Sequence, residues 1–251
     1  MTPLAALAVL AAGAFAGTVN TVVGSGSLVT FPVLLGLGYP PLVANVSNTV
    51  GLVPGSVSGA IGYRVELRGQ RSRLLRLGAF SLLGGLAGGL LLLARPDTFE
   101  AVVPLLVILA SLLMAVSPRL SARLRARQGG TARAPSRVLL PLLVFLTGVY
   151  GGYFGAAQGV ILLALLGLLE DDGLQRLNAM KNVLAGLVNG VAAVLFVLVS
   201  DVSWPVAGLL AVGAVVGGQA GAKLARRIPD APLRAVIVVG GLVVGVVLLL
   251  R

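Results

Sequence analysis

Eight apolar runs, each long enough to cross or nearly cross a lipid bilayer, dominate this sequence. They lie at about 4–23, 42–63, 74–94, 99–117, 138–155, 176–199, 203–222 and 233–250. A helix needs about 20 apolar residues to span the hydrocarbon core. Two shorter runs, 28–37 and 159–169, directly follow the first and fifth runs and are too short to cross alone. Because backbone groups in lipid must be bonded internally, the pattern predicts an all-α polytopic membrane protein in which the short runs form re-entrant half-helices.

The small share of charged residues supports a membrane protein. Only 11% of the 251 residues are charged, whereas soluble domains average about 25%. The chain has no Cys and no His, so it lacks the usual ligands of zinc, copper and haem, and we expect neither a metal nor a cofactor. The net charge of +11 suits loops that orient a membrane protein better than nucleic-acid binding, which we do not expect. No basic residue precedes the apolar residues 4–16, so we expect this segment to be retained rather than cleaved as a signal peptide.

The two halves of the sequence match each other at an offset of 131, which becomes 133 after two extra residues at "EDDG", 170–173. The matches are glycines and polar residues inside apolar segments: Gly17 with Gly148, Gly24 with Gly155, Asn45 with Asn178, and Asn48 with Lys181. Chance matching of abundant residues is the alternative interpretation. Polar positions that coincide within apolar helices favour a true repeat.

The basic loops predict how the chain is oriented. Loops 64–76 and 118–137 carry five and six Arg, and loop 223–234 carries four Lys or Arg. Short basic loops remain in the cytoplasm, which places the near-neutral turns at 95–98 and 200–203 outside. Basic loop 64–76 therefore corresponds to the turn at 200–203, and the near-neutral turn at 95–98 corresponds to basic loop 223–234.

This charge pattern predicts two inverted-topology repeats, each a re-entrant hairpin plus three spanning helices. The first repeat would cover 1–117 and the second 138–251, joined by a basic cytoplasmic linker at 118–137. Both termini would lie outside a cytoplasmic (inner) membrane.

The stretch "TVNTVVGSGSLVTFP", 18–32, places polar and helix-weakening residues inside the first apolar segment. Its counterpart is "YGGYFGAAQGV", 150–160. Such breaks are tolerated in a membrane only against protein or a watery cavity, and the N-terminus of a half-helix suits an anion. We expect Ser25 or Ser27 to cap the half-helix that begins near Leu28. Close helix packing through small residues is the alternative interpretation.

A polar stripe also follows one face of the next helix in each half. In the first half it holds Asn45, Asn48, Thr49 and Ser56; in the second it holds Asn178, Lys181, Asn182 and Asn189. Lys181 is the only cation well inside a predicted span. An intramembrane charge indicates function by default, although Lys181 lies close enough to the interface for snorkelling to be the alternative.

The acidic residues all lie in predicted loops or at helix ends. A proton relay or a carboxylate Na⁺ site therefore has no evident parts within the spans, and a neutral to positive cavity favours an anionic substrate. No nucleophile–base pair indicates an enzyme, because Lys181 and Ser25 or Ser27 would form a dyad only if they touched.

Three segments resemble the sulfite exporter TauE/SafE family of membrane permeases. They are "AGTVNTVVGSGSLVTFPVLLGLGYPPLVANVSNTVGLVPGSVSGAIGYR" at 16–64, "LNAMKNVLAGLVNGVAAVLF" at 177–196, and 213–246. The resemblance implies a two-repeat helical fold and transport of small sulfur-containing anions such as sulfite, sulfonates or related organosulfur acids.

We therefore expect a transporter that exports small anions, with a channel-like conductor or a non-transporting membrane scaffold as alternatives. The substrate-binding residues would be donors to oxyanion oxygens, with Lys181 supplying the charge: Asn20, Thr21, Ser25, Gly26, Ser27, Asn48, Thr49, Gln158, Gly159, Lys181 and Asn182.

Overall fold

The protein is a bundle of α-helices, seen in a computed structural model that describes residues 1–127, 138–170, 172–224 and 231–250. No strand occurs in these ranges, as the sequence predicts. The helices are α1 (Pro3–Val22), α2 (Ser27–Gly36), α3 (Pro41–Gly62), α4 (Arg71–Ala94), α5 (Pro96–Arg127), α6 (Leu139–Tyr153), α7 (Gln158–Leu169), α8 (Leu174–Val199), α9 (Trp204–Leu224) and α10 (Ala231–Leu249).

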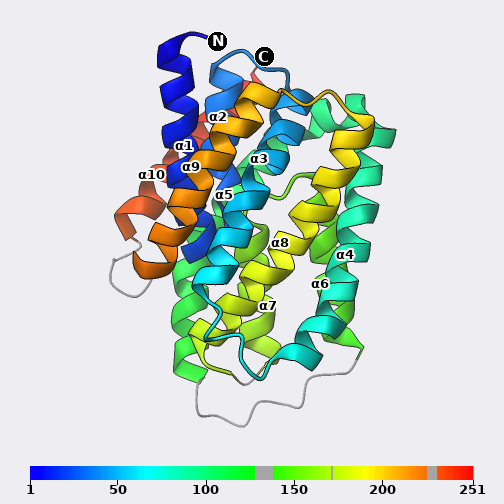
Figure 1. Cartoon of the computed structure of the whole chain (residues 1–251), viewed down its shortest axis with the longest axis vertical. Coiled ribbons are helices and arrows are strands. Elements are labelled where there is room, and N and C mark those ends of the chain that lie inside the picture. The colour runs from blue at the N-terminus through cyan, green and yellow to red at the C-terminus, as the bar shows by residue number, and fades with distance from the viewer. Residues whose placement is uncertain (128–137, 171, 225–230, 251) are drawn as a thin grey trace.

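Two helical hairpins, α1–α2 and α6–α7, enter the bundle from opposite ends (Figure 1). Their tips meet inside the bundle, where the Gly159 N–H donates a hydrogen bond to the Gly24 carbonyl over 3.0 Å. Both short helices lie within a residue of their predicted positions, so the re-entrant hairpins are present as the sequence predicts. Gly24 and its sequence match Gly155 both adopt a positive φ, of 92° and 79°, at the two breaks.

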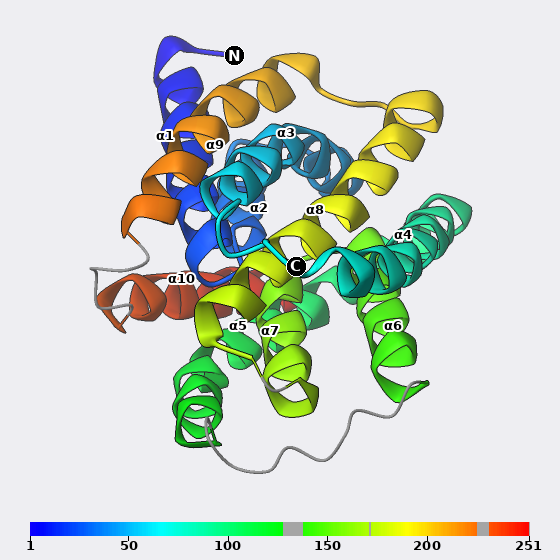
Figure 2. The same cartoon turned by 60° about the horizontal axis from the view of Figure 1, so that its bottom comes forward.

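Helices α3 and α8 pack against each other at the centre of the bundle. On one side of them α1 packs on α9, and on the other α6 packs on α4 (Figure 2). Helices α5 and α10 form a further pair. If α1–α5 are matched in order with α6–α10, most of these contacts have a counterpart. For example, the contact of α1 with α9 corresponds to the contact of α6 with α4.

Pairs of glycines four residues apart let the outer helices approach closely. A Cβ added at any of them would meet main-chain atoms of the facing helix. In membranes this spacing brings backbones together because there is no hydrophobic force between helices to do so. The pairs are Gly13 and Gly17 in α1, Gly84 and Gly88 in α4, Gly148 and Gly152 in α6, and Gly213 and Gly217 in α9.

Within the described residues, five helices are long and apolar enough to cross a membrane: α1, α4, α5, α8 and α9. The predicted runs at 42–63, 138–155 and 233–250 form α3, α6 and α10. Helix α3 is 22 residues long, but polar residues interrupt its apolar sequence. Helix α6 has only 15 residues.

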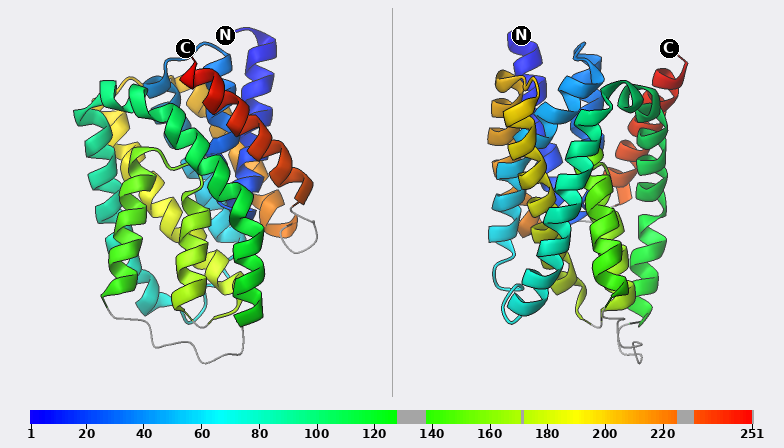
Figure 3. Two further views of the ribbon diagram at one scale, coloured as in Figure 1. Left: turned by 180° about the vertical axis from the view of Figure 1, so that it is seen from behind. Right: turned by 90° about the vertical axis from the view of Figure 1, so that its right-hand side faces the viewer.

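The ends of the bundle agree with the predicted loop arrangement. The α3–α4 loop, the end of α5 and the start of α6 lie at one end, and the start of α1 and the end of α10 lie at the other (Figure 3). Helix α5 continues through Pro118 to Arg127, so the first part of the segment 118–137 is helical. The rest of that segment, and residues 225–230 of loop 223–234, fall outside the described residues.

Candidate functional site

Lys181 lies in α8 near the centre of the bundle, with only 1% of its surface exposed. Its Nζ donates hydrogen bonds to the Asn20 carbonyl over 3.2 Å and the Thr21 carbonyl over 3.3 Å. These carbonyls belong to the last turn of α1, where the helix dipole favours a cation. Lys181 therefore does not snorkel in this structure. Instead it places its amino group at the broken end of the first hairpin.

Two asparagines on the same face of α8 bond to the same helix end. Asn178 and Asn182 both donate through Nδ2 to the Thr21 carbonyl, over 3.3 Å and 3.2 Å. Asn178 also donates to the Tyr63 hydroxyl over 2.9 Å. Three side-chain donors therefore converge on one carbonyl oxygen, which has two lone pairs to offer.

A small enclosed cavity adjoins this cluster. Its lining includes Asn20, Thr21, Ser56, Lys181, Asn182 and Ala185. The centre of a water molecule can occupy about 10 Å³ of this cavity. The cavity therefore has room for about one water. The structure therefore brings together four of the predicted site residues, Asn20, Thr21, Lys181 and Asn182, in a closed arrangement.

Asn48, the sequence match of Lys181, forms hydrogen bonds with the start of α2 instead. It donates to the Ser27 hydroxyl over 3.1 Å and accepts a hydrogen bond from the Thr30 hydroxyl. Asn20 joins the two arms of the same hairpin, because its Oδ1 accepts from the Gly26 N–H over 3.4 Å. The polar residues of the first break thus hold the hairpin in shape as well as facing the cavity.

The expected serine cap of α2 was wrong. The N-cap residue is Gly26, which has no side chain to cap the first turn. Ser25 donates to the Met114 sulfur over 3.2 Å, and the Ser27 hydroxyl is engaged by Asn48. Both hydroxyls therefore bond to partners on α5 and α3 and do not cap α2.

The second break is capped in a related way from the opposite half. Asn45 of α3 donates to the Tyr153 carbonyl over 3.1 Å, at the end of α6. Gln158 is buried against Gly151, and within the described residues its Nε2 has no hydrogen-bond partner. Thr49 bonds to the Asn45 carbonyl of its own helix over 3.0 Å. Within the described part of the chain, none of these residues bonds to the Lys181 amino group.

Asn45 and Asn178 therefore form a crossed pair, each closing a helix end in the other half of the chain. In a bilayer such carbonyls have no water to bond to, so the two amides help to hold the halves together. Both residues could be identified from the sequence, because they lie at helical spacing with other polar residues. The sequence holds no comparable signal for Tyr63, which is fully buried beside Asn178.

The approach of Gly24 to Gly159 allows a direct test of the hairpin contact. A Cβ at Gly159 would meet the main chain of Gly24, which no rotamer change can relieve. Gly159→Ala is expected to lower stability by about 1–3 kcal/mol, the usual cost of overpacking. The measurement is the thermal unfolding midpoint of the purified protein in detergent.

Gly208→Ala is the matched control, because nothing lies within 4 Å of a Cβ added at this position in α9. It should leave the midpoint unchanged or raise it slightly, since Ala favours a helix over Gly by about 0.5–1 kcal/mol. Equal midpoints for the two variants would contradict the tight crossing of the hairpin tips.

Comparison with known proteins gives consistent matches over nearly the whole chain. A family model described as "Sulfite exporter TauE/SafE" matches residues 9–248. The probable membrane transporter protein YfcA of Escherichia coli K12 is 27% identical over 229 residues, which cover 89% of this chain and 82% of that protein. A probable membrane transporter protein of Haemophilus influenzae is 28% identical over 231 residues, covering 90% and 88%. The probable membrane transporter protein ORF9 of Sinorhizobium sp. is 28% identical over 221 residues, covering 87% and 83%.

Proposed function

Because the chain belongs to the sulfite exporter TauE/SafE family of membrane transporters and is not an enzyme, we propose that it carries small sulfur-containing anions across the inner membrane. The observation that carries this proposal is the burial of the Lys181 amino group at the broken end of the first hairpin. The ion pairs between described residues join Glu170 and Asp172 to Arg73 and Arg176, and none of them involves Lys181. Lys181 has only carbonyl acceptors, so its charge is available to an anion.

The donors around the cavity suit a small oxyanion. Lys181, Asn178 and Asn182 crowd the single Thr21 oxygen, which two lone pairs cannot serve equally well. One of these donors can therefore turn to a bound oxygen at little cost. Hydrogen bonds to charged groups are worth about 1.5–3 kcal/mol each. Such a donor, together with the Lys181 ammonium, would favour sulfite or a sulfonate head group.

We further propose that the halves are inverted repeats that move against each other. The entry of the hairpins from opposite ends (Figure 1), the recurring helix contacts and the paired positive-φ glycines support this. Such transporters bind substrate near the midplane, between broken helices. The closed cavity beside Lys181 then corresponds to an occluded state, with the basic end of the bundle in the cytoplasm.

Membrane potential sets the direction of this transport. With the cytoplasm negative, moving one negative charge outward gains about 2.3 kcal/mol per 100 mV. Export driven by this potential needs no coupling ion. We expect sulfite efflux from loaded proteoliposomes to rise several-fold when the interior is made negative.

The flux assay compares sulfite with sulfate, thiosulfate, taurine and a simple carboxylate at two imposed potentials. Liposomes without protein report leakage. Sulfite flux that did not respond to the potential would rule out electrogenic export, and equal flux of the carboxylate would rule out selectivity for sulfur oxyanions.

A further inference from the structure

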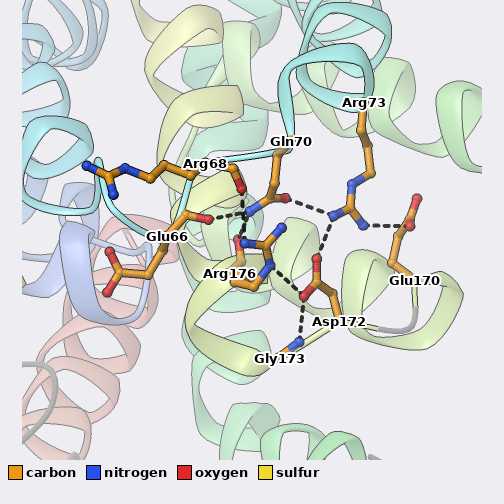
Figure 4. A network of polar contacts seen from close by, with 8 residues as sticks. All are labelled: Glu66, Arg68, Gln70, Arg73, Glu170, Asp172, Gly173 and Arg176. Carbon is orange, nitrogen blue, oxygen red and sulfur yellow. Dashed lines mark hydrogen bonds and ion pairs between the residues drawn. The ribbon is translucent and has the colours of Figure 1, made fainter.

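A cluster of ion pairs lies away from the cavity, at the end of the bundle that holds the α3–α4 loop (Figure 4). Arg73, in the first turn of α4, bonds to the Glu170 carboxylate over 2.7 Å and to Asp172 over 2.5 Å. Arg176, in the first turn of α8, bonds to the other oxygen of Asp172 over 2.8 Å. The cluster therefore ties the first half of the chain to the second.

Gln70 and main-chain carbonyls extend the cluster into the α3–α4 loop. The Gln70 side chain is 1% exposed. It donates to the carbonyls of Glu66 and Arg176 over 2.8 Å and 3.2 Å, and accepts from Arg73 over 3.0 Å. Arg176 also donates to the Arg68 carbonyl over 3.1 Å. The loop is thus fastened along its length to the start of α8.

This fastened loop lies on the inner side of the Lys181 cavity. Arg176 precedes Lys181 by five residues in α8, about 7.5 Å along a helix axis. The loop leaves α3 at Tyr63, whose hydroxyl accepts from Asn178 next to the cavity. The polar contacts therefore form a continuous series from the cavity to the inner end of the bundle.

The opposite end of the bundle has no such fastening among the described residues. The three ion pairs between described residues all belong to the inner cluster. The connection from α8 to α9 is bonded to α3 by the Ser203 N–H and the Ser47 hydroxyl over 2.8 Å. Burial opposes the charge of Asp172, but hydrogen bonds from Arg73, the Gly173 amide and Arg176 outweigh it and lower the pKa of its carboxyl. The Asp172 carboxyl therefore stays ionised near neutral pH and can pair with both arginines.

We propose that Arg73, Glu170, Asp172 and Arg176 form the latch of an inner gate, which must break before the cavity opens to the cytoplasm. Rocking of one repeat against the other is the general mode of such transporters, and the latch spans that division. Its removal shifts the population toward an inward-open state. This proposal does not depend on which anion is carried.

The absence of Cys from the chain makes the gate testable by labelling a single introduced thiol. Ser56→Cys places the thiol at the cavity, and a membrane-impermeant thiol reagent is applied to vesicles from either face. Adding Arg73→Ala is expected to speed labelling from the inner face about five- to tenfold, as loss of its two partly exposed pairs permits. Labelling from the outer face should fall.

Further variants separate the latch from a general loosening of the protein. The combined change of Glu170→Gln and Asp172→Asn, which keeps side-chain shape, should match Arg73→Ala, while Arg73→Lys should restore most of the slow labelling. Arg76→Ala, an exposed arginine of the same helix, should change nothing. Unchanged inner labelling in both neutralised variants, or faster labelling from both faces, would overturn the latch. Because no anion is present, neither outcome depends on the proposed substrate.

Discussion

Replacing Lys181 with methionine is expected to weaken sulfite binding by about 10- to 100-fold. Met fills much of the same space but removes the ammonium, and a hydrogen bond to a charged group contributes about 1.5–3 kcal/mol. Lys181→Arg keeps the charge and should retain most of the affinity, although its planar fork differs from an ammonium. Calorimetric titration of the purified variants with sulfite measures the difference directly.

A purely structural role for Lys181 makes a different prediction. If the ammonium only closes the end of α1, through Asn20 and Thr21, then Lys181→Met lowers the unfolding midpoint without changing sulfite affinity. The midpoint of each variant is therefore recorded beside its affinity. Wild-type affinity in Lys181→Met would remove Lys181 from the proposed site.

The two hairpins could be predicted from sequence because their signals are local. An apolar run of ten or eleven residues after a glycine-rich break cannot span a bilayer, and α2 and α7 begin and end close to those runs. The match of Gly24 with Gly155 was also informative, since both residues adopt the positive φ that glycine permits. Helix ends of this kind are fixed by residues that are neighbours in sequence.

The partners of the polar groups could not be predicted in the same way. Ser27 was a capping candidate by sequence, yet it is the first residue of α2 and its hydroxyl accepts from Asn48 of α3. Lys181 and its match Asn48 occupy related places in sequence, but one bonds to the end of α1 and the other to the start of α2. The inner latch joins residues about one hundred positions apart. Such choices depend on how α3 and α8 pack between the halves, which no local pattern encodes.

The crossed asparagines provide a second large expected effect. The same substitution should lower sulfite affinity at one of the two matched positions and lower stability at the other. Asn178→Asp places a carboxylate beside Lys181, because the Asn178 amide and the Lys181 ammonium share the Thr21 oxygen as acceptor. The new carboxylate should pair with the ammonium, so the protein stays folded. Sulfite affinity should fall by at least about tenfold, because the hydrogen-bonded charge that the anion uses is now occupied.

Asn45→Asp makes the same change at the end of α6, beside the Tyr153 carbonyl. No cation bonds to this helix end in the described part of the chain, and Asn45 is 1% exposed, so the carboxylate is buried without compensation. Such a charge costs about 3–5 kcal/mol. Asn45→Asp should therefore lose far more stability than Asn178→Asp when their unfolding midpoints are compared. Tight sulfite binding by Asn178→Asp would place the anion away from Lys181, and equal stability of the two variants would mean that the two helix ends do not differ in charge.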